Sequence, residues 1–341
     1  MIKTCIIGAS GYTGAELVRL ISQHPSYVLD AIFVSSNSQD AHKSISDLHA
    51  ALIGVTDLIL CPLQDDALEQ LAWDYDVIFL ATPHEASHEW IPTLAGKRAV
   101  ILDLSGAYRL QDRSVFEQYY GFAHTDQIWL EHAVYGLAEW YPQQISDASV
   151  VAVPGCYPTA SLSGLKPLFN ANLLDTNVRP VINAISGVSG AGRKAALSNS
   201  FCEVGLQAYG ILAHRHMPEI TEHLGTEVIF TPHLGTFKRG ILATITVKCS
   251  DNTTIEHINS AFEQAYPKGG LVRLRRSAPK LDDVVHTPFC DIFYAYDATS
   301  QYAVITVAID NVLKGAAAQA LQCANLTQGL AVNSGLIAEA E

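Results

Sequence analysis

Three glycines that follow the first strand-like segment constrain the fold of this chain more than any other feature. Residues 2–7 form a short apolar run, and Gly8, Gly11 and Gly14 separate it from a segment whose apolar residues recur at helical spacing. Glycine permits a tight strand-to-helix turn and lets backbone N–H groups approach a diphosphate. The spacing G-x-x-G-x-x-G is a variant of the dinucleotide fingerprint, and its position between strand and helix predicts a dinucleotide-binding fold.

Continuous apolar runs alternate with helical patterns up to about residue 150. Runs such as DVIFLATP and RAVILDLSG are typical of an α/β fold with a Rossmann-type, doubly wound parallel sheet. Beyond that point the strand-like runs are longer and separated by loops, which predicts an α+β catalytic and oligomerisation domain with a mainly antiparallel sheet. We expect a dinucleotide-binding domain over 1–153, completed by a C-terminal helix over 311–341, and a catalytic domain over 154–310.

Composition narrows the partners of the chain. Its formal net charge of −13 over 341 residues argues against nucleic acid or an anionic membrane as the main partner. An anionic small molecule stays possible, because one pocket can be basic on an acidic protein. No apolar stretch approaches the ~20 residues of a membrane helix, and the N-terminus lacks the pattern of a secretory signal. We therefore expect a small-molecule substrate, with no nucleic-acid or membrane partner.

The seven cysteines are spread singly and form no C-x-x-C pair. Such a set is typical of reduced thiols in the cytoplasm, and it makes a cysteine-ligated metal unlikely. Cys5, Cys61 and Cys249 are expected to be buried side chains. We expect a cytoplasmic protein with no metal.

The end of the second strand predicts which dinucleotide binds. NAD enzymes usually place Asp or Glu there to hold the ribose hydroxyl. This chain has Ser36 and Ser38 instead, with Lys43 nearby, and Asp40 comes slightly late. Hydroxyls and a lysine accommodate a 2′-phosphate that a carboxylate would repel. The pattern favours NADP(H).

Cys156 occupies the point where a strand is followed by a helix. A β-branched run ends at Val153, Pro154-Gly155 interrupts it, and a helical pattern begins in CYPTASLSGLKPL, with Pro158 in its expected first turn. A helix N-terminus favours a thiolate, which is the nucleophilic form of cysteine. Cys156 is therefore a candidate nucleophile.

The segment AHRHMPEITEHLG offers a base for that cysteine. We expect a helix from Pro218 to Gly225, and if the preceding segment is extended, His214 and His216 share one face. His216 lies closer to the helix N-terminus, which disfavours imidazolium, so His214 is slightly preferred as the general acid/base. The neighbouring Arg215 and Glu219 are candidates for an anion clamp and an orienting group.

A second small-residue loop, ISGVSGAGRKAA at 185–196, follows a later strand. Its glycines, Gly187 and Gly190 among them, allow close approach of a flat or anionic ligand. Alone, the loop is also compatible with a surface turn. Beside a nicotinamide site, it is expected to pack on the cofactor.

These residues together resemble a known family. VAVPGCYPTASLSGLKP resembles the active-site signature of N-acetyl-γ-glutamyl-phosphate reductases, NADPH-dependent enzymes of arginine biosynthesis. Further segments resemble that family in the same order along nearly the whole chain: GASGYTGAELVRLI, DLSGAYRL, YGLAE, SGVSGAGR, AHRHMPEI, FTPHLGTFKRGILAT and IDNVLKGAAAQA. The resemblance implies reduction of N-acetyl-γ-glutamyl phosphate to the 5-semialdehyde, with release of phosphate, through a cysteine thioester. It also implies a homodimer or homotetramer.

The resemblance implies roles for particular residues. Cys156 would be the nucleophile, with His214 and His216 at the acid/base position. Contacts to the cofactor would come from Gly11, Thr13, Gly14, Ser186, Gly187, Ser189, Gly190, Asn311 and Lys314. The glycine turn and the end of the second strand add Gly8, Ser10, Tyr12, Ser36 and Ser38 as expected cofactor contacts, independently of the resemblance. Contacts to the substrate or its phosphate would come from Ser105, Arg109 and Arg239. Arg215 and Glu219, the candidates beside the histidines, are also expected to contact the substrate.

The chain departs from the family pattern in segments expected to line the substrate pocket. Residues 106–108 are Gly-Ala-Tyr where Ala-Asp-Phe is common, Ala138 replaces a proline, and residues 235–238 also differ. Alternative substrates are therefore those of aspartate-semialdehyde dehydrogenase, or an aminoadipate or carrier-linked acyl phosphate. An alternative of another class is an NADP-binding regulator without catalysis, which the presence of Cys156 and both histidines disfavours.

Overall fold

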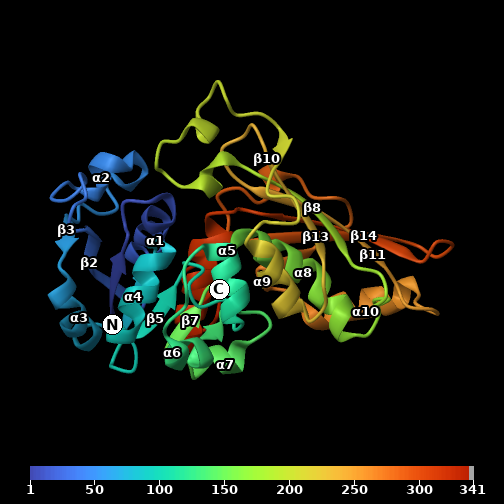
Figure 1. Cartoon of the computed structure of the whole chain (residues 1–341), viewed down its shortest axis with the longest axis horizontal. Coiled ribbons are helices and arrows are strands. Elements are labelled where there is room, and N and C mark those ends of the chain that lie inside the picture. Colours follow the sequence, from blue (N-terminus) through green and yellow to red (C-terminus); the bar gives the residue numbers. More distant parts are fainter. Residues whose placement is uncertain (338–341) are drawn as a thin grey trace. The chain divides into compact units, whose positions relative to one another are not determined.

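The computed structural model describes residues 1–337, and the chain divides into two compact units. Unit 1 comprises residues 1–155 together with the C-terminal segment from residue 316, and unit 2 comprises residues 156–315. Each unit is built on its own sheet, and each sheet has seven strands among the described residues (Figure 1).

The sheet of unit 1 is entirely parallel, with the strand order β3-β2-β1-β4-β5-β7-β6. Its strands are β1 (Ile2–Ile7), β2 (Tyr27–Ser35), β3 (Leu60–Leu63), β4 (Val77–Leu80), β5 (Val100–Asp103), β6 (Val134–Tyr135) and β7 (Val150–Ala152). All four residues of β4 are buried, as expected for a central strand that is covered on both faces. This confirms the predicted doubly wound sheet.

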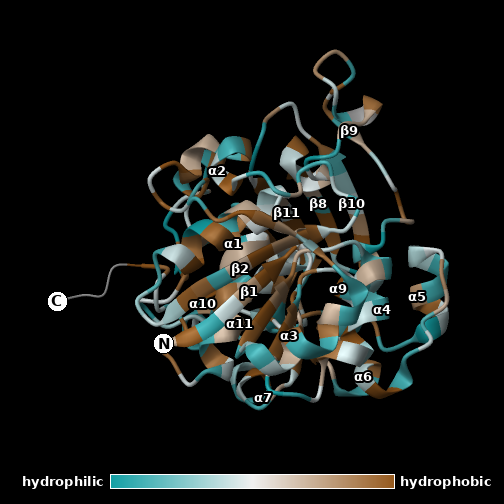
Figure 2. Ribbon diagram, turned by 90° about the vertical axis from the view of Figure 1, so that its left-hand side faces the viewer, coloured by the Kyte–Doolittle hydropathy of each residue, from teal (hydrophilic) through white to brown (hydrophobic). Residues whose placement is uncertain are grey.

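Helices surround the sheet of unit 1. They are α1 (Tyr12–Ser22), α2 (Ile45–Leu48), α3 (Leu68–Asp74), α4 (His84–Leu94), α5 (Arg113–Tyr120), α6 (Gln127–His132), α7 (Pro142–Ser146) and α11 (Ala318–Thr327). Figure 2 shows apolar residues concentrated on strands such as β1 and β2, and polar residues on the outward faces of helices such as α4 and α5. The core of unit 1 therefore lies between the sheet and its helices.

The C-terminal helix is shorter than the sequence pattern predicts. A π-helical turn covers Leu313–Ala317, and α11 follows it and packs against β5, α7 and α1. The helix ends at Thr327 because Gly329 adopts φ +67°, and the Leu330 N–H bonds back to the carbonyl of Asn325. The expected helix over 311–341 is thus wrong in its length, and its last four positions lie outside the described residues.

The sheet of unit 2 is mixed and mostly antiparallel, in the order β12-β13-β14-β11-β8-β10-β9. Its strands are β8 (Val181–Ser186), β9 (Gln207–Ala208), β10 (Ile229–Leu234), β11 (Ile241–Lys248), β12 (Val272–Leu274), β13 (Cys290–Asp297) and β14 (Tyr302–Ile309). Burial alternates strictly along β11, so one face of the sheet is covered and the other is partly open. The predicted mainly antiparallel sheet is confirmed.

The covered face of this sheet carries α8 (Cys156–Asn170), with α9 (His216–Leu224) and α10 (Ile255–Ala265) packed against α8. Every residue of α8 from Tyr157 to Leu168 is buried. A Cβ at Gly164 would lie 2.9 Å from Ile245 Cδ1, so this glycine lets the helix approach β11 closely. The packing fixes α8 and thereby the residue at its N-terminus, Cys156.

Candidate active site

The glycine turn of unit 1 is packed at backbone distance. Gly8 adopts φ +92°, and a Cβ there would lie 2.2 Å from the carbonyl oxygen of Ala81. A Cβ at Gly14 would lie 2.5 Å from the carbonyl oxygen of Gly8. No side chain other than hydrogen fits at either position. The turn therefore forms a narrow cradle between β1, α1 and the loop after β4.

The N-terminus of α1 presents its backbone N–H groups without a competing anion. Gly11 is the N-cap, no side chain caps the helix, and its first turn contains no acidic residue. Tyr12 is exposed and Thr13 is half-buried. His49 Nε2 lies 2.9 Å from the carbonyl oxygen of Ser10 and so anchors the glycine turn. Such a helix start fits the diphosphate of a dinucleotide.

The end of β2 places the two predicted serines on the surface of unit 1. Ser36 is exposed, and Ser38 Oγ accepts a hydrogen bond of 3.2 Å from the Asp40 N–H. The carboxylate of Asp40 forms an ion pair of 3.3 Å with Lys43. This pairing offsets the negative charge of Asp40, the acidic residue that follows the two serines.

Cys156 is the first residue of α8 and is half-buried. The helix is 15 residues long, so its N-terminal partial positive charge is well developed. The π-helical turn packs directly on this cysteine, because a Cβ at Gly315 would lie 2.8 Å from Cys156 Cβ. Cys156 thus has the environment in which a thiolate is favoured.

The two predicted histidines lie together, beside the residue that follows Cys156. The ring centroids of His214 and His216 are 4.8 Å apart, and the Tyr157 ring meets both rings edge-on. The Tyr157 hydroxyl lies 3.2 Å from that of Tyr209, whose ring also meets His214 edge-on. Burial, together with the nearby charge of Arg215, lowers the pKa of His214 to about 4. His214 is therefore neutral at pH 7.

The backbone around these histidines differs from the prediction. Helix α9 begins at His216, two residues earlier than expected, and Arg215 before it has helical rather than extended dihedral angles. His214 Nδ1 accepts a hydrogen bond of 3.1 Å from the His216 N–H and so satisfies a donor at the start of the helix. The rings are therefore brought together by helix capping and not by an extended strand.

Two further residues of this segment have contrasting environments. Arg215 is exposed, whereas Glu219 in the first turn of α9 is fully buried. A carboxylate in the first turn is stabilised by the helix dipole. Their roles as substrate contacts stay predictions.

The second glycine loop is held against the loop between β10 and β11. The N–H groups of Gly187, Val188 and Ser189 donate to the carbonyls of Gly240, Phe237 and Lys238, respectively. A Cβ at Gly187 would lie 2.5 Å from the Arg239 nitrogen, so the glycine is required by this packing.

Several predicted cofactor residues cluster at this loop. Asn311 Nδ2 donates to Ser189 Oγ at 3.0 Å, and Asn311 Oδ1 accepts from the Gly240 N–H at 2.7 Å. Ser186 is buried beneath Gly190, and Lys314 is fully buried in the π-helical turn. Unit 2 therefore contains Cys156, both histidines and the whole set of Ser186, Gly187, Ser189, Gly190, Asn311 and Lys314.

The predicted substrate contacts Ser105 and Arg109 belong to unit 1 and are bound within it. Ser105 Oγ donates to buried Asp103 at 2.8 Å, and Arg109 donates to the carbonyls of Leu104 and Val153. Both side chains are nearly inaccessible to solvent. Arg239, in unit 2, pairs with buried Asp310 through a contact of 2.6 Å. The roles of all three in substrate binding stay predictions.

The remaining cysteines, all within the described residues, form no disulfide. Cys5 and Cys249 are buried as predicted, but Cys61 is exposed, because it lies on the edge strand β3. Among residues 1–337, no group of His, Cys, Asp and Glu side chains could hold a metal ion. Within the same range, no helix has the length and apolar character needed to cross a bilayer.

Sequence reasoning missed three residues that shape this site: Tyr209, Asp310 and Gly315. Tyr209 is 52 positions from its partner Tyr157, so no local pattern reveals the contact. Asp310 and Gly315 lie within the segment IDNVLKGA. The available signal was the glycine itself, because a glycine in a small-residue helix indicates close packing.

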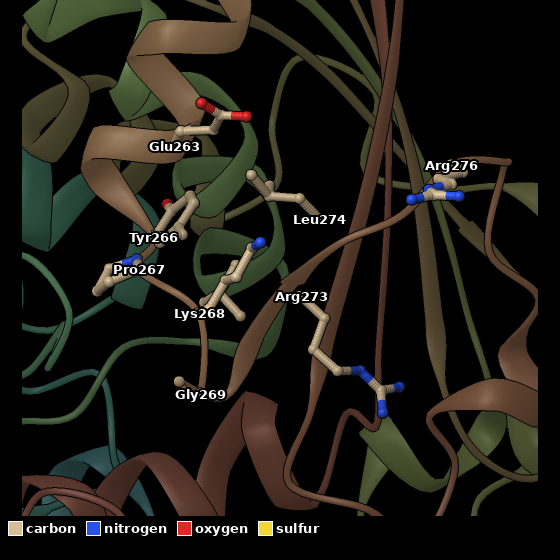
Figure 3. Close-up of a pocket in the computed structure, with 10 residues that line it drawn as sticks. Glu263, Tyr266, Pro267, Lys268, Gly269, Arg273, Leu274 and Arg276 are labelled. Atoms are coloured by element: carbon tan, nitrogen blue, oxygen red, sulfur yellow. The ribbon is translucent and has the colours of Figure 1, made fainter.

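A large cavity of unit 2 lies away from all the predicted site residues. It has a volume of about 590 Å³ and lies between the end of α10 and β12 (Figure 3). None of the residues that line it belongs to the predicted site.

Two family models match the chain. The semialdehyde dehydrogenase NAD binding domain matches residues 3–148, and the semialdehyde dehydrogenase dimerisation domain matches residues 156–311. Among curated proteins, the N-acetyl-gamma-glutamyl-phosphate reductase of Pseudoalteromonas atlantica is 59% identical over 339 residues, which is 99% of each chain. The proteins of that name from Vibrio vulnificus and Escherichia coli K12 are each 52% identical over 338 residues, covering 99% of this chain and 100% of theirs.

Solved structures share the fold at low sequence identity. Aspartate semialdehyde dehydrogenase II from Vibrio cholerae aligns with a TM-score of 0.73 at 16% identity, covering 96% of this chain and 98% of its own. The Candida albicans aspartate semialdehyde dehydrogenase, solved with NADP, aligns with a TM-score of 0.68 at 12% identity, covering 96% and 99%. At this identity, the likeness concerns the fold alone.

Proposed function

The chain belongs to the N-acetyl-gamma-glutamyl-phosphate reductase family, and from this membership we propose how its own residues carry out the reaction. The enzyme is an NADP-dependent oxidoreductase of arginine biosynthesis. It reduces N-acetyl-gamma-glutamyl phosphate to N-acetylglutamate 5-semialdehyde and releases phosphate. The observation that carries the proposal is the position of Cys156 at the start of the buried helix α8.

Cys156 is the nucleophile in this proposal. Its sulfur forms a bond to the acyl carbon while the bond from that carbon to the phosphate oxygen breaks, which leaves a thioester and inorganic phosphate. The N–H groups at the start of α8 stabilise the negative charge that develops on the carbonyl oxygen. When bound, NADPH supplies the hydride that reduces the thioester.

His214 is the proposed acid/base. Because its Nδ1 accepts from the His216 N–H, the neutral ring carries its hydrogen on Nε2, which donates to the carbonyl oxygen of the substrate as negative charge develops there. Cys156 attacks as the thiolate and leaves as the thiolate when the aldehyde departs, and the released phosphate takes up one proton from the solvent, so the protons of the step balance. Tyr157 and Tyr209 hold the His214 ring by edge contacts, and His216 supports it through the capping hydrogen bond.

Three further arrangements follow from the proposal. The cofactor diphosphate lies on the turn from Gly8 to Gly14, with Ser36 and Ser38 at the 2′-phosphate, and the nicotinamide side meets Ser186–Gly190, Asn311 and Lys314. Arg239, Arg215, Glu219, Ser105 and Arg109 contact the substrate. Residues 1–153 with the C-terminal segment form the NADP-binding domain, and residues 154–310 form the catalytic domain.

Self-association is proposed to involve unit 2, as a homodimer or homotetramer. Unit 2 carries the match to a dimerisation domain, and the outer face of its sheet exposes Val304 and Tyr302. The arm around β9, which extends from unit 2 in Figure 2, exposes Phe201 almost completely. Large apolar side chains exposed in this way are available for subunit contacts. Seven cysteines outside disulfides support a cytoplasmic location.

The reaction is tested in the reverse, phosphate-dependent direction, by following NADPH formation. N-acetylglutamate semialdehyde is expected to be oxidised much faster than aspartate semialdehyde or glyceraldehyde 3-phosphate. Equal or faster oxidation of either rival would contradict the assignment of the substrate.

The nucleophile is tested with Cys156→Ala, which is expected to abolish turnover and to retain NADPH binding. Cys61→Ala is the matched control, because Cys61 is exposed on an edge strand, and it should keep full activity. Substantial turnover by Cys156→Ala would refute the role of the thiol.

A further inference from the structure

Asp310 is a fully buried carboxylate that joins three segments of unit 2. Its Oδ2 accepts from Arg239 Nε at 2.6 Å and from the His286 N–H at 2.7 Å. Its Oδ1 accepts from the Val312 and Leu313 N–H groups at 2.8 and 2.9 Å. The side chain thus uses one oxygen for distant segments and the other for the turn that follows it.

Asp310 Oδ1 organises the turn that packs on Cys156. With Asp310 as its cap, the backbone makes a π-helical turn in which the Gly315 N–H donates to the Asp310 carbonyl at 2.9 Å. Gly315 then lies against Cys156, where a Cβ would come within 2.8 Å of the cysteine Cβ. π-helical turns are rare and are frequently found at functional sites.

Asp310 Oδ2 holds two segments that are distant in sequence, those of Arg239 and His286. His286 has φ +64°, a conformation that side chains rarely adopt, and its N–H is held by Asp310. Arg239 follows the loop that is hydrogen-bonded to Gly187–Ser189. The ion pair through Nε sets the plane of the Arg239 guanidinium, because its five N–H donors lie in one rigid fork.

From these contacts we infer that Asp310 is a positioning residue, which aims the Arg239 guanidinium at the phosphoryl group and holds the π-helical turn against Cys156. This inference rests on the proposed roles of Cys156 and Arg239. Asp310 is fully buried, so in this inference it acts through Arg239 and the π-helical turn.

Asp310→Asn separates the two oxygens. Asparagine forms the same local turn to the N–H groups two and three residues ahead, so its carbonyl keeps the contacts to Val312 and Leu313. Its amide N–H₂ then faces Arg239 Nε and the His286 N–H, which are both donors. The variant therefore disturbs Arg239 and leaves the π-helical turn in place.

The expected result is a rise of about tenfold in KM for phosphate in the reverse reaction, as for one charge-assisted hydrogen bond. Arg239→Lys keeps the charge but lacks Nε and should give a similar rise. The double variant should be no worse than either single variant, because both changes break one contact. The rate of Cys156 alkylation by iodoacetamide should stay within about twofold of the parent for Asp310→Asn, since the turn is retained.

Gly315→Ala is the complementary variant. Its new Cβ pushes on Cys156, so it should slow alkylation of Cys156 at least fivefold, on the order expected for displacement of a packed reactive group. The inference is overturned if Asp310→Asn changes KM for phosphate by less than twofold. It is also overturned if the effects of Asp310→Asn and Arg239→Lys on KM multiply in the double variant. If Asp310→Asn does not fold, Arg239→Lys alone decides: a KM within twofold of the parent overturns the inference. Full activity of Cys156→Ala would instead overturn the proposed function.

A second inference concerns the cavity near β12. Five of the 21 lysines and arginines of this acidic chain fall between residues 268 and 280, and that segment contains no Asp or Glu. Lys268, Arg273 and Arg276 line the cavity, and Glu263 is its acidic residue (Figure 3). The volume of about 590 Å³ is in the range of small-molecule sites.

The cations of the cavity differ in their partners. Arg273 is fixed by buried Asp291, through contacts of 2.5 and 3.0 Å, and lies over the Phe289 ring. For Lys268 and Arg276, the structure gives no ion pair within the described residues. The wall residue Tyr266 donates to the Ser163 carbonyl of α8 at 2.7 Å, which links the cavity to the helix that begins at Cys156.

We propose that this cavity binds a small, multiply charged anion. Citrate and inorganic pyrophosphate are the probes, and calorimetric titration of the full chain should detect saturable binding of at least one. The double variant Lys268→Ala/Arg276→Ala should lose that binding, whereas Arg239→Lys, which alters the proposed phosphate contact, should retain it. No saturable binding to the parent, or binding that survives the double variant, refutes the site.

Discussion

Replacing Gly14 by alanine places a methyl group 2.5 Å from the Gly8 carbonyl oxygen and 2.6 Å from the Cα of Ala9. Ordinary contact begins at 3.4 Å, so α1 has to withdraw from the turn. Overpacking of this kind costs about 1–3 kcal/mol. Alanine recovers up to about 1 kcal/mol of helix propensity. We therefore expect a net destabilisation of roughly 0–3 kcal/mol, which is measured in the absence of cofactor.

The same movement carries the N–H groups of α1 away from the diphosphate position. Each hydrogen bond to a charged group contributes about 1.5–3 kcal/mol, so the loss of one weakens NADPH binding by roughly 10- to 150-fold. Fluorescence titration with NADPH measures this change, and thermal unfolding of the cofactor-free protein measures the cost in stability.

Gly11→Ala is the contrasting variant, because its Cβ would lie 3.7 Å from the Gly8 carbonyl oxygen, an ordinary contact. Its stability should change by less than about 1 kcal/mol, the typical difference between glycine and alanine at an N-cap. NADPH affinity should still fall, because the methyl group occupies the space of the diphosphate. Parent-like affinity in Gly14→Ala would refute the packing argument, and parent-like affinity in Gly11→Ala would refute the position of the diphosphate.

Two further predictions concern His214 and Gly225. Because burial lowers the pKa of His214 to about 4, the unfolded chain binds the proton more readily, and the contribution of this residue to stability is present above pH 6.5 and lost as the pH falls towards 4. Between pH 7 and pH 5, the free energy of unfolding measured in urea should therefore fall by about 2 kcal/mol less in His214→Gln than in the parent. An identical fall in both proteins would contradict the buried neutral ring. Gly225 ends α9 at φ +91°, so Gly225→Ala should destabilise the protein by about 1–2 kcal/mol and leave kcat at 25 °C unchanged. Unchanged urea unfolding of Gly225→Ala would show that the left-handed position carries no strain.

Local sequence patterns were sufficient for the fold class and for the glycine turn. The buried strands of unit 1 are continuous apolar runs, so their periodicity is visible within a few residues. The cysteine at the start of α8 was equally visible, because Pro154 and Gly155 end the preceding strand and Pro158 is compatible with a first helical turn. The family was recognisable from the same segments, and the comparisons confirm it.

The geometry of the site was not predictable in the same way. The start of α9 was misplaced by two residues, since the His214 ring acts as a cap and a ring nitrogen is an unusual partner for a helix N-terminus. The predicted C-terminal helix was longer than the observed one, because the sequence pattern alone did not show that Gly329 adopts a left-handed conformation. Both errors concern boundaries, where single hydrogen bonds decide the outcome.

The dinucleotide turn and the cysteine at a helix start are each encoded by neighbouring residues, so both were predictable without the structure. Only the packing of the folded chain brings Tyr209 to Tyr157 and lets Asp310 join Arg239 to the π-helical turn. These contacts connect residues 52 and 71 positions apart. The physical reason is that such pairs are set by packing across a sheet, to which local backbone preference contributes nothing.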